Sequence, residues 1–521
     1  MQQFIRYFCT RIGSDIMTRQ KFLIWATCLL MAINGWGQQV REVININHGY
    51  YTTTLRSTND IVRPEGAERS RAFDYNPRLR QLTTANRGDT LWIDLFEDIQ
   101  YKAVITDVTV DYDNVLGITA CIAGYDFASC ILSVSKAGIS LRADIPTLNK
   151  HYRIANLAGQ PVLSQYSLSA NLVPDQPMPP FVKPAQQTGL PQLRAIEDPD
   201  EHTIIDVMVV YSVKAKEWAD KNATSIDNAI SLAFQYANHV LDNSEVNLTF
   251  RVVRKYETDY AESTDANMDL TAFRDNGDGI MDEVHEMRRE YGADLVVLMP
   301  MTGAWAYLPN YDLNKPDASF GFSVCNIGGS TYGSTLIHEL GHNLGAHHHW
   351  QQLPQRFPGP GIFIYSSAWR GVDEDGQWLH TVMSYDGNSF ADKNPSVLIP
   401  YFSNPEVIVN GVAIGSMAKE NNALTLNQTK HVIARYSELI GSKNPATGTA
   451  VITDDALKVY AADGGVFVSG IHPGESLQVF NLSGLYIYKC IAISDREYIA
   501  LSEGGFYIVV AGGRSFKIFV K

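Results

Sequence analysis

Apolar and polar residues alternate in short runs through the first third of the chain. From Gln38 to Leu172 these runs are separated by turn residues, and alternation with a period of two is typical of strands that bury one face. We therefore expect a β-rich domain over residues 38–172. The clearest expected strands are Asp89–Leu95, Tyr101–Tyr112, Cys130–Val134 and Gly138–Ile145.

The pattern changes at Thr203. Thr203–Tyr211 is an almost continuous apolar run, as expected of a buried strand, whereas Thr224–Leu241 repeats its apolar residues at helical spacing. Strands alternate with helices from here on, which indicates an α/β domain over residues 203–440. The other expected elements are strands at Val246–Val253 and Ala293–Met299 and helices at Ile280–Tyr291 and Thr335–Leu344.

Two segments separate the expected domains. Residues 173–202 contain seven prolines and read as an extended, cleavable linker, and residues 441–450 are rich in Gly, Ser, Pro and Thr. Short runs with Gly-rich turns over residues 451–521 then predict a small β-sandwich. Its expected strands are Leu457–Tyr460, Val466–Val468, Leu477–Phe480, Tyr486–Tyr488, Phe506–Val510 and Phe516–Val520.

The first 37 residues read as a secretory signal peptide. An apolar run, Phe22–Ile33, follows Arg19 and Lys21 and precedes a Gly-Trp-Gly stretch ending at Gly37, which is the order of charged, apolar and small residues in such signals. We expect cleavage after Gly37, with Met17 as an alternative start; the other interpretation is a short buried helix. No other stretch looks able to span a bilayer, so we expect a secreted or surface protein without a transmembrane anchor.

Composition and cysteine content limit the possible partners. The chain of 521 residues has 42 Lys and Arg against 56 Asp and Glu, a formal net charge of -14, which gives no support to nucleic-acid binding. Two of the six cysteines precede residue 38, and no C-x-x-C pair occurs. Cys121 and Cys130 flank a turn, where either a disulfide or two buried thiols is expected.

Metal-binding residues are concentrated between His338 and His349. His338 and His342 are four residues apart, so on a helix their imidazoles lie on one face, and neutral imidazole is a preferred ligand of Zn²⁺. Glu339 follows the first histidine and is placed to act as the general base for an attacking water. The spacing therefore predicts a catalytic zinc site.

A third protein ligand is expected ten residues after the first, at His348. The chain must leave the helix and turn back to bring His348 to the same metal, and Gly345 tolerates the left-handed conformation such a turn needs. His347 and His349 flank His348, but the spacing favours His348. We interpret the two neighbours as surface groups or as residues behind the ligands.

The motif H-E-x-x-H-x-x-G-x-x-H resembles that of the metzincin metallopeptidases. The resemblance implies a mixed, twisted sheet with a zinc helix, and a methionine turn below the metal, for which Thr381–Tyr385 is the matching segment. Met383 is then the structural methionine, and Tyr385 is either a catalytic residue or simply a packed side chain. The branch most similar is the reprolysin or adamalysin branch, although His349 replaces its usual Asp and Thr203–Ile440 has one cysteine, Cys325.

The resemblance also suggests how a substrate binds. In metzincins a peptide substrate adds to the edge strand of the active-site sheet. We expect Phe320–Val324 to be that strand and Ala304–Leu308 to line the cleft. Asp275, Asp278 and Asp282 flank glycines, as in a Ca²⁺ loop, but a helix-capping turn explains these residues better than a calcium site does.

The C-terminal region has a resemblance of its own. Glu503–Val510 and Lys517–Lys521, with Val479–Gly484 between the earlier strands, are similar to the sorting domain of the type IX (Por) secretion system of some Gram-negative bacteria. The resemblance implies the secretion machinery as a partner and removal of this domain on export. A generic β-sandwich or carbohydrate-binding module is the alternative.

Together these features predict a secreted zinc endopeptidase that acts on proteins or peptides and is made as a latent precursor. The N-terminal β domain would be its pro-domain, with Cys121, Cys130 or an Asp occupying the metal's open position, or merely a folding aid. Two other functions are a catalytically inactive surface binding protein or adhesin on the same scaffold and a zinc hydrolase of a non-peptide amide.

Overall fold

The computed structural model describes residues 43–46, 63–157, 159–167, 201–310, 312–352 and 361–441, together with most strands between 458 and 520. All of them fall within one compact unit, Val43–Lys521. The expected signal peptide and almost all of the two linkers lie outside the described residues. Among the described helices, none combines the length and apolar character needed to cross a bilayer.

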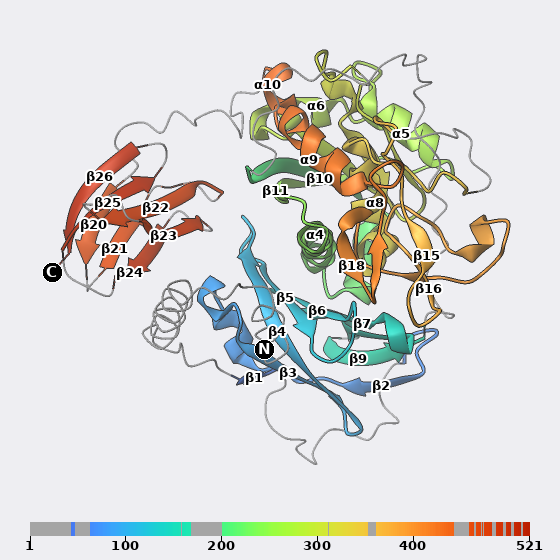
Figure 1. Cartoon of the computed structure of the whole chain (residues 1–521), viewed down its shortest axis with the longest axis horizontal. Coiled ribbons are helices and arrows are strands. Elements are labelled where there is room, and N and C mark those ends of the chain that lie inside the picture. Colours follow the sequence, from blue (N-terminus) through green and yellow to red (C-terminus); the bar gives the residue numbers. More distant parts are fainter. Residues whose placement is uncertain are drawn as a thin grey trace, which may run out of the picture. The chain divides into compact units, whose positions relative to one another are not determined.

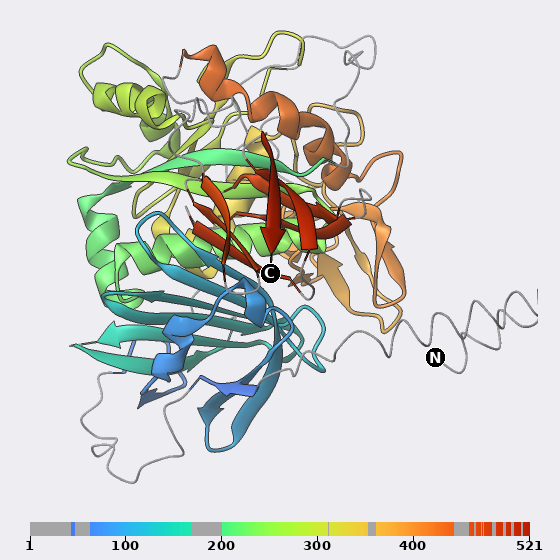
Figure 2. The same ribbon diagram turned by 90° about the vertical axis from the view of Figure 1, so that its left-hand side faces the viewer.

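The N-terminal region forms one nine-stranded sheet, in the order β1-β3-β4-β5-β6-β7-β8-β9-β2 (Figures 1 and 2). Consecutive strands from β3 to β9 pair antiparallel, and inward residues such as Ile93, Ile118 and Leu141 share one core. The expected strands are confirmed. The bounds are β1 (Val43–Asn45), β2 (Arg69–Ala72), β3 (Thr90–Phe96), β4 (Ile99–Val110), β5 (Leu116–Ile122), β6 (Ser129–Ser135), β7 (Gly138–Ile145), β8 (Lys150–Leu157) and β9 (Gln160–Tyr166).

Cys121 and Cys130 are both free thiols, so the disulfide interpretation is wrong. Cys121 pairs with Ser129, and Cys130 pairs with Ala120. The two cysteines are thus one residue out of register, and because side chains alternate between faces of a sheet they point to opposite sides.

The central region contains a five-stranded sheet in the order β11-β10-β12-β14-β13. The first four strands are parallel and β13 is antiparallel, which confirms the expected mixed sheet. The strands are β10 (Thr203–Ser212), β11 (Leu248–Thr258), β12 (Leu295–Met299), β13 (Ala304–Ala306) and β14 (Phe322–Cys325). The helices are α3 (Val213–Asn222), α4 (Ile226–Asn243), α5 (Ala266–Arg274), α6 (Asp282–Tyr291), α7 (Ile327–Tyr332), α8 (Thr335–Asn343), α9 (Asn422–Ile433) and α10 (Tyr436–Leu439).

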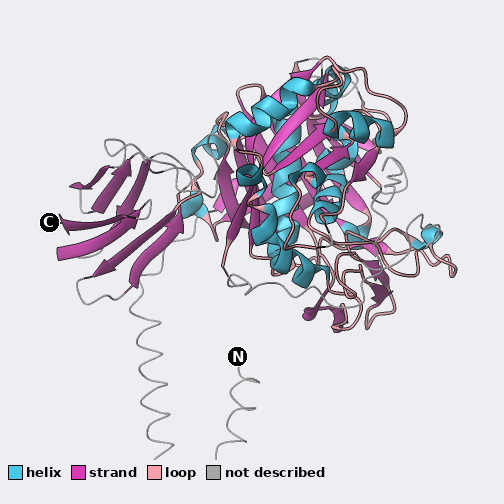
Figure 3. Cartoon of the chain, turned by 90° about the horizontal axis from the view of Figure 1, so that it is seen from above, coloured by secondary structure: helices cyan, strands magenta, loops and turns pink. Residues whose placement is uncertain are grey.

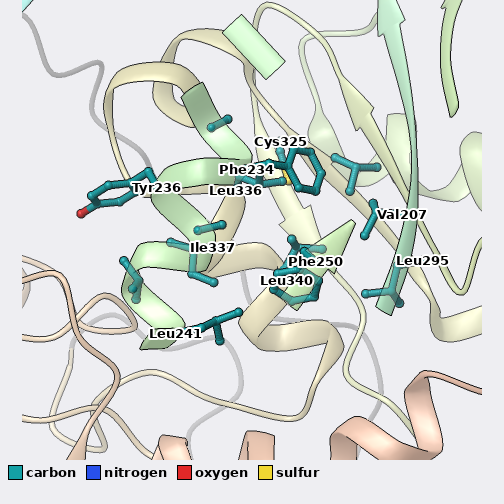
Figure 4. Packing of buried hydrophobic residues seen from close by; sticks show 14 of the residues in the cluster. Val207, Phe234, Tyr236, Leu241, Phe250, Leu295, Cys325, Leu336, Ile337 and Leu340 are labelled. Carbon is teal, nitrogen blue, oxygen red and sulfur yellow. The ribbon is translucent and has the colours of Figure 1, made fainter. Parts of the chain in front are cut away.

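Helices cover both faces of this sheet (Figure 3). Alternate residues of β10 and β12, such as Val207 and Leu295, pack against α4 and α8, while Met208 and Val296 pack against α5 and α6 on the other face. Figure 4 shows Leu336, Ile337 and Leu340 of α8 among the side chains of α4 and the sheet. This layering fixes α8 on one face of the sheet.

The expectation for the substrate-binding edge was wrong in detail. β14, which covers most of Phe320–Val324, lies between β12 and β13 and is not an edge strand. The outer strand is β13, formed by the first residues of Ala304–Leu308. Only three residues long, β13 lacks the alternation that would reveal a strand in the sequence.

Short strands complete the central region beyond α8. They are β15 (Arg370–Val372), β16 (Trp378–His380), β17 (Val397–Leu398), β18 (Asn404–Val409) and β19 (Val412–Ile414). The turn before α6 is closed by its own carboxylates: Asp282 accepts from the backbone N–H of Gly277 and Gly279, and Asp278 from that of Ile280. These bonds close the turn, but they do not cap the helix, because the N-cap residue of α6 is Met281 and no side chain caps it.

The C-terminal strands form a three-stranded sheet, β20-β21-β24, and a four-stranded sheet, β23-β22-β25-β26. Val466 and Ile499 of the first sheet share one core with Val479 and Val509 of the second, as expected of a small β-sandwich. The bounds are β20 (Lys458–Ala462), β21 (Gly465–Ser469), β22 (Ser476–Asn481), β23 (Tyr486–Ile491), β24 (Arg496–Ala500), β25 (Gly505–Ala511) and β26 (Arg514–Val520).

Candidate metal centre

Helix α8 carries the first part of the motif and ends at a defined turn. The Gly345 N–H donates to the His342 carbonyl at 2.8 Å, and the Ala346 N–H donates to the Gly341 carbonyl at 2.9 Å. This is the Schellman arrangement, in which the residue after the helix is left-handed, and Gly345 has a φ of +93°. The chain therefore reverses at the position the sequence predicted, and His348 returns toward the helix.

The reversal brings three imidazoles together. Nε2 of His348 lies 3.1 Å from Nε2 of His338 and 3.0 Å from Nε2 of His342, and the three residues form a group able to hold a metal ion. All three side chains are buried. Three nitrogens bound to one tetrahedral zinc would lie about 3.4 Å apart, given Zn–N distances of about 2.1 Å, so the observed cluster fits the ion.

Backbone carbonyls set the tautomers of two of these histidines. Nδ1 of His338 lies 2.8 Å from the carbonyl oxygen of Val382, and Nδ1 of His342 lies 2.9 Å from that of Ala346. A carbonyl only accepts, so each Nδ1 carries the hydrogen and each Nε2 keeps its lone pair. Lone pairs directed at one point repel each other unless a cation lies between them. A backbone carbonyl that accepts from Nδ1 is also a typical partner of a metal-bound histidine.

Burial favours the neutral, ligating form of these histidines. It lowers the pKa of His338 to about 4. The pKa values of His342 and His348 are also lowered well below the usual value, first by burial and then by the neighbouring imidazoles. Because protonated imidazole cannot bind a metal, the fold keeps the group ready for a cation at neutral pH.

His347 and His349 stay outside the metal-binding group. Both are buried, at 3% and 4% exposure, so the interpretation as surface groups was wrong. His347 lies behind the ligands, with its backbone held by the Asn422 amide. His349 lies 3.6 Å from the Glu420 carboxylate and stacks on Trp350.

The methionine turn lies directly against α8. The N–H of Ser384 donates to the Thr381 carbonyl at 2.8 Å, which closes the turn around Val382 and Met383. Met383 is fully buried, and a Cβ added at Gly341 would meet its sulfur at 2.8 Å. Glycine in the second half of the helix thus allows the close approach, and Val382 reaches the His338 ring from the same turn.

Comparisons with known proteins agree with this geometry. The family described as metallo-peptidase family M12B, reprolysin-like, matches residues 227–349. A peptidyl-Asp metalloendopeptidase from Stenotrophomonas maltophilia is 26% identical over 310 residues, which cover 58% of this chain and 69% of the relative. Another from Xanthomonas campestris pv. campestris is 28% identical over 314 residues, covering 58% and 68%.

The chain is a zinc metalloendopeptidase. Among solved structures, metalloproteinase-II from Bacteroides fragilis matches with 13% identity and a TM-score of 0.37, covering 63% of this chain and 93% of that one.

Glu339 and Tyr385 of the metalloendopeptidase lie beside the histidines. Glu339 is fully buried on α8, one residue after His338. The Tyr385 ring stacks on His338 with centroids 5.7 Å apart, and its hydroxyl lies 3.5 Å from Nε2 of His348. The site therefore combines three imidazoles, one carboxylate and one phenol.

Asn343 is a site residue that the motif did not reveal. Its side-chain amide donates to the carbonyls of Tyr307, Phe320 and Phe322 at 2.9, 3.2 and 3.2 Å. These carbonyls lie just after β13 and around the start of β14, so Asn343 ties α8 to the outer edge of the sheet. The sequence shows only an Asn after His342, and the partners are distant along the chain.

The described N-terminal strands supply no member of the metal-binding group. Cys130 is buried in the core of the N-terminal sheet, and burial raises the pKa of its thiol, which disfavours the ligating thiolate. Cys121 is half-buried on the neighbouring strand. Latency through a cysteine bound to the metal therefore gains no support from the described residues.

We expect Gly345→Ala to destabilise the enzyme and weaken zinc binding. The left-handed backbone alone costs an alanine about 1–2 kcal/mol, and its Cβ would in addition meet Ile362 at 2.5 Å. Gly376→Ala is the matched control, because Gly376 has a φ of +83° with no atom within 4 Å. Urea denaturation and zinc titration should show a larger loss in Gly345→Ala; equal losses would show that the turn does not position His348.

Proposed function

We propose that the protein is a secreted zinc endopeptidase in which His338, His342 and His348 bind the metal. The observation that carries the proposal is the convergence of three buried Nε2 atoms at 3.0 and 3.1 Å. Two of the rings are held by carbonyls in the tautomer that leaves Nε2 open. No purely structural role explains why three imidazole lone pairs should meet in the interior.

Bound zinc would supply a Lewis acid that makes a water molecule more acidic and polarises the scissile carbonyl. Glu339 then acts as the general base: its carboxylate takes a proton from the attacking water and passes it to the leaving amine. This carboxylate is fully buried and follows His338 directly on α8. The Tyr385 hydroxyl, which lies 3.5 Å from Nε2 of His348, donates a hydrogen bond to the developing oxyanion.

The substrate is an extended peptide lying along β13. As the outer strand of the sheet, β13 can pair with a substrate strand through its backbone, and Asn343 holds this edge against α8. The relatives are named peptidyl-Asp metalloendopeptidases. We therefore propose that peptide bonds next to aspartate are the preferred targets.

The enzyme is made as a precursor and exported. The signal-like segment before Gly37 and the proline-rich linker support this, and the strands β25 and β26 contain most of the segments that resemble the sorting domain. In this proposal the linker is cut after export, the C-terminal domain is removed by the secretion machinery, and the mature enzyme works outside the cell.

The test is metal analysis and peptide cleavage by the purified full chain before and after cutting of the linker. We expect about one zinc per chain and cleavage of casein that a chelator stops and added zinc restores. In matched peptides, Asp should be cut faster than Asn. Bound zinc with no cleavage of casein, peptides or small amides would favour a binding protein, cleavage of small amides alone would favour an amide hydrolase, and no zinc would overturn the site.

A further inference from the structure

Two arginines of the N-terminal sheet contact the segment that leads into the zinc helix. Helix α7 ends at Tyr332 and α8 begins at Thr335, so only Gly333 and Ser334 join them. Nη1 of Arg142, on β7, donates to the Gly333 carbonyl at 2.6 Å and reaches the Thr331 carbonyl at 3.5 Å. Nη2 of Arg153, on β8, reaches the Tyr332 carbonyl at 3.5 Å.

The carbonyls at this junction need partners from outside the helix. The last turn of a helix leaves its carbonyl groups without intrahelical donors and carries a partial negative charge. The two guanidinium groups supply both hydrogen bonds and positive charge at this point. Each also lies over an aromatic ring, Arg142 at 3.5 Å from the Tyr236 centroid and Arg153 at 4.8 Å from that of Tyr332.

Asp144 holds the two arginines together. Its carboxylate lies 2.6 Å from Nε of Arg142 and 2.6 Å from Nη2 of Arg153, and the three side chains are at most 9% exposed. Burial by itself raises the pKa of Asp144. The positive charges of Arg153 and Arg142 outweigh this effect and hold the pKa of Asp144 well below its usual range. The N-terminal sheet thus presents a preformed, buried ionic cluster to the α7–α8 junction.

This contact is linked to the metal site through a short stretch of backbone. The Ser334 carbonyl accepts the first hydrogen bond of α8, from the His338 N–H at 3.0 Å. The direction of α8, and with it the positions of His338 and Glu339, therefore depends on where Gly333 and Ser334 lie. Arg142 fixes that point from one side, and Tyr236 of α4 supports the same guanidinium from another.

We propose that Arg142 and Arg153 are positioning residues for the zinc site, so that the N-terminal domain shapes the metal centre as well as covering the catalytic domain. The proposal rests on the zinc site proposed above. It gives this domain a role that requires no side chain at the metal. It also implies that the N-terminal domain stays bound to the catalytic domain when the linker between them is cut.

Arg142→Met in the full chain tests the proposal. The methionine keeps the apolar stem of the arginine side chain. Asp144 stays paired with Arg153, so its buried carboxylate is not left without a cationic partner. We expect zinc affinity, measured by competition with a chelator, to fall at least tenfold. The visible absorption of the cobalt-substituted protein, which reports ligand geometry, should also change. Arg142→Lys, which keeps the charge but not the fork of donors, should recover part of both.

Arg71→Met is the matched control. Arg71 also lies in the N-terminal sheet, donates to the carbonyls of Leu95 and Asp94, and lies over an aromatic ring, Phe73, but these partners all belong to the N-terminal domain. It should leave zinc affinity and the cobalt spectrum unchanged. If Arg142→Met does not fold, Arg153→Met, which breaks the more distant contact, should still weaken zinc binding by a smaller factor.

The outcomes separate this inference from the proposed function. Unchanged zinc affinity and cobalt spectra in folded Arg142→Met or Arg153→Met would overturn the positioning role while leaving the metal site intact. Equal effects of Arg142→Met and Arg71→Met would reduce the contact to general stability and also overturn it. A wild-type chain that takes up neither zinc nor cobalt would sink the metal assignment and this inference with it.

Discussion

Replacing Glu339 with glutamine should remove nearly all peptidase activity while leaving the fold and zinc content unchanged. Glutamine has the shape of glutamate but cannot accept the proton of the attacking water. General acid–base catalysis contributes about 10²–10⁴-fold, and Glu339 would serve in both proton transfers. We therefore expect kcat to fall at least about 10³-fold with little change in KM, measured on a fluorogenic peptide.

A second glutamate tests whether the effect is specific. Glu438→Gln, on α10, removes a partly exposed carboxylate that pairs with Arg435, and it should leave kcat and zinc content at wild-type values. Near-normal kcat in zinc-loaded Glu339→Gln would exclude Glu339 as the general base. Loss of zinc together with activity would instead assign Glu339 a structural role on α8.

Local features of the sequence predicted that His338, His342 and His348 would meet. The spacing of His338, His342 and His348 is a short-range pattern, and a helix followed by a glycine turn can form it in only one way. Periodicity likewise revealed β10, α4 and four of the nine strands of the N-terminal sheet, because alternation records which face is buried. Helices α3, α5, α7, α9 and α10 were missed, since they are short or their apolar residues are few or lack a clear stripe.

Long-range contacts could not be predicted from one sequence. The pairing of Cys121 with Ser129 depends on turn geometry, and a shift of one residue moves a side chain to the other face. The amide of Asn343 and the guanidinium of Arg142 bind backbone carbonyls, which carry no sequence signature. The position of β13 at the sheet edge follows from tertiary packing, since three residues show no period.

Acidification should destabilise the zinc-free protein strongly between pH 7 and pH 5. Burial lowers the pKa of His239, His338 and His347 to about 4 and that of His380 to about 3. In the unfolded chain these imidazoles take up protons near pH 6.5. The unfolded state thus binds more protons in this range, so the free energy of unfolding falls as the pH drops below about 6.5.

The size of the effect is a balance between histidines and buried carboxyls. At pH 5 each of the four imidazoles costs roughly 2 kcal/mol, about 1.4 kcal/mol per pH unit. Two carboxyls act in the opposite direction, because burial raises the pKa of Asp294 to about 7 and that of Asp242 to about 6. These two carboxyls stabilise the folded state by roughly 4 kcal/mol over the same range, which leaves a net loss of at least roughly 4 kcal/mol, because the lowered pKa values of His342 and His348 add to the loss. This is a large part of the 5–15 kcal/mol typical of a domain.

Urea denaturation of the chelated protein at pH 7, 6 and 5, followed by tryptophan fluorescence, measures this loss. His239→Leu removes one buried imidazole on α4, away from the metal-binding group, and should reduce the fall between pH 7 and pH 5 by roughly 2 kcal/mol. Zinc should stabilise the protein more at pH 7 than at pH 5, because its ligands must be neutral. An unfolding free energy that stays level or rises on acidification would show that these histidines are protonated in the folded state. A metal ion would then have to displace protons from the imidazoles before it could bind.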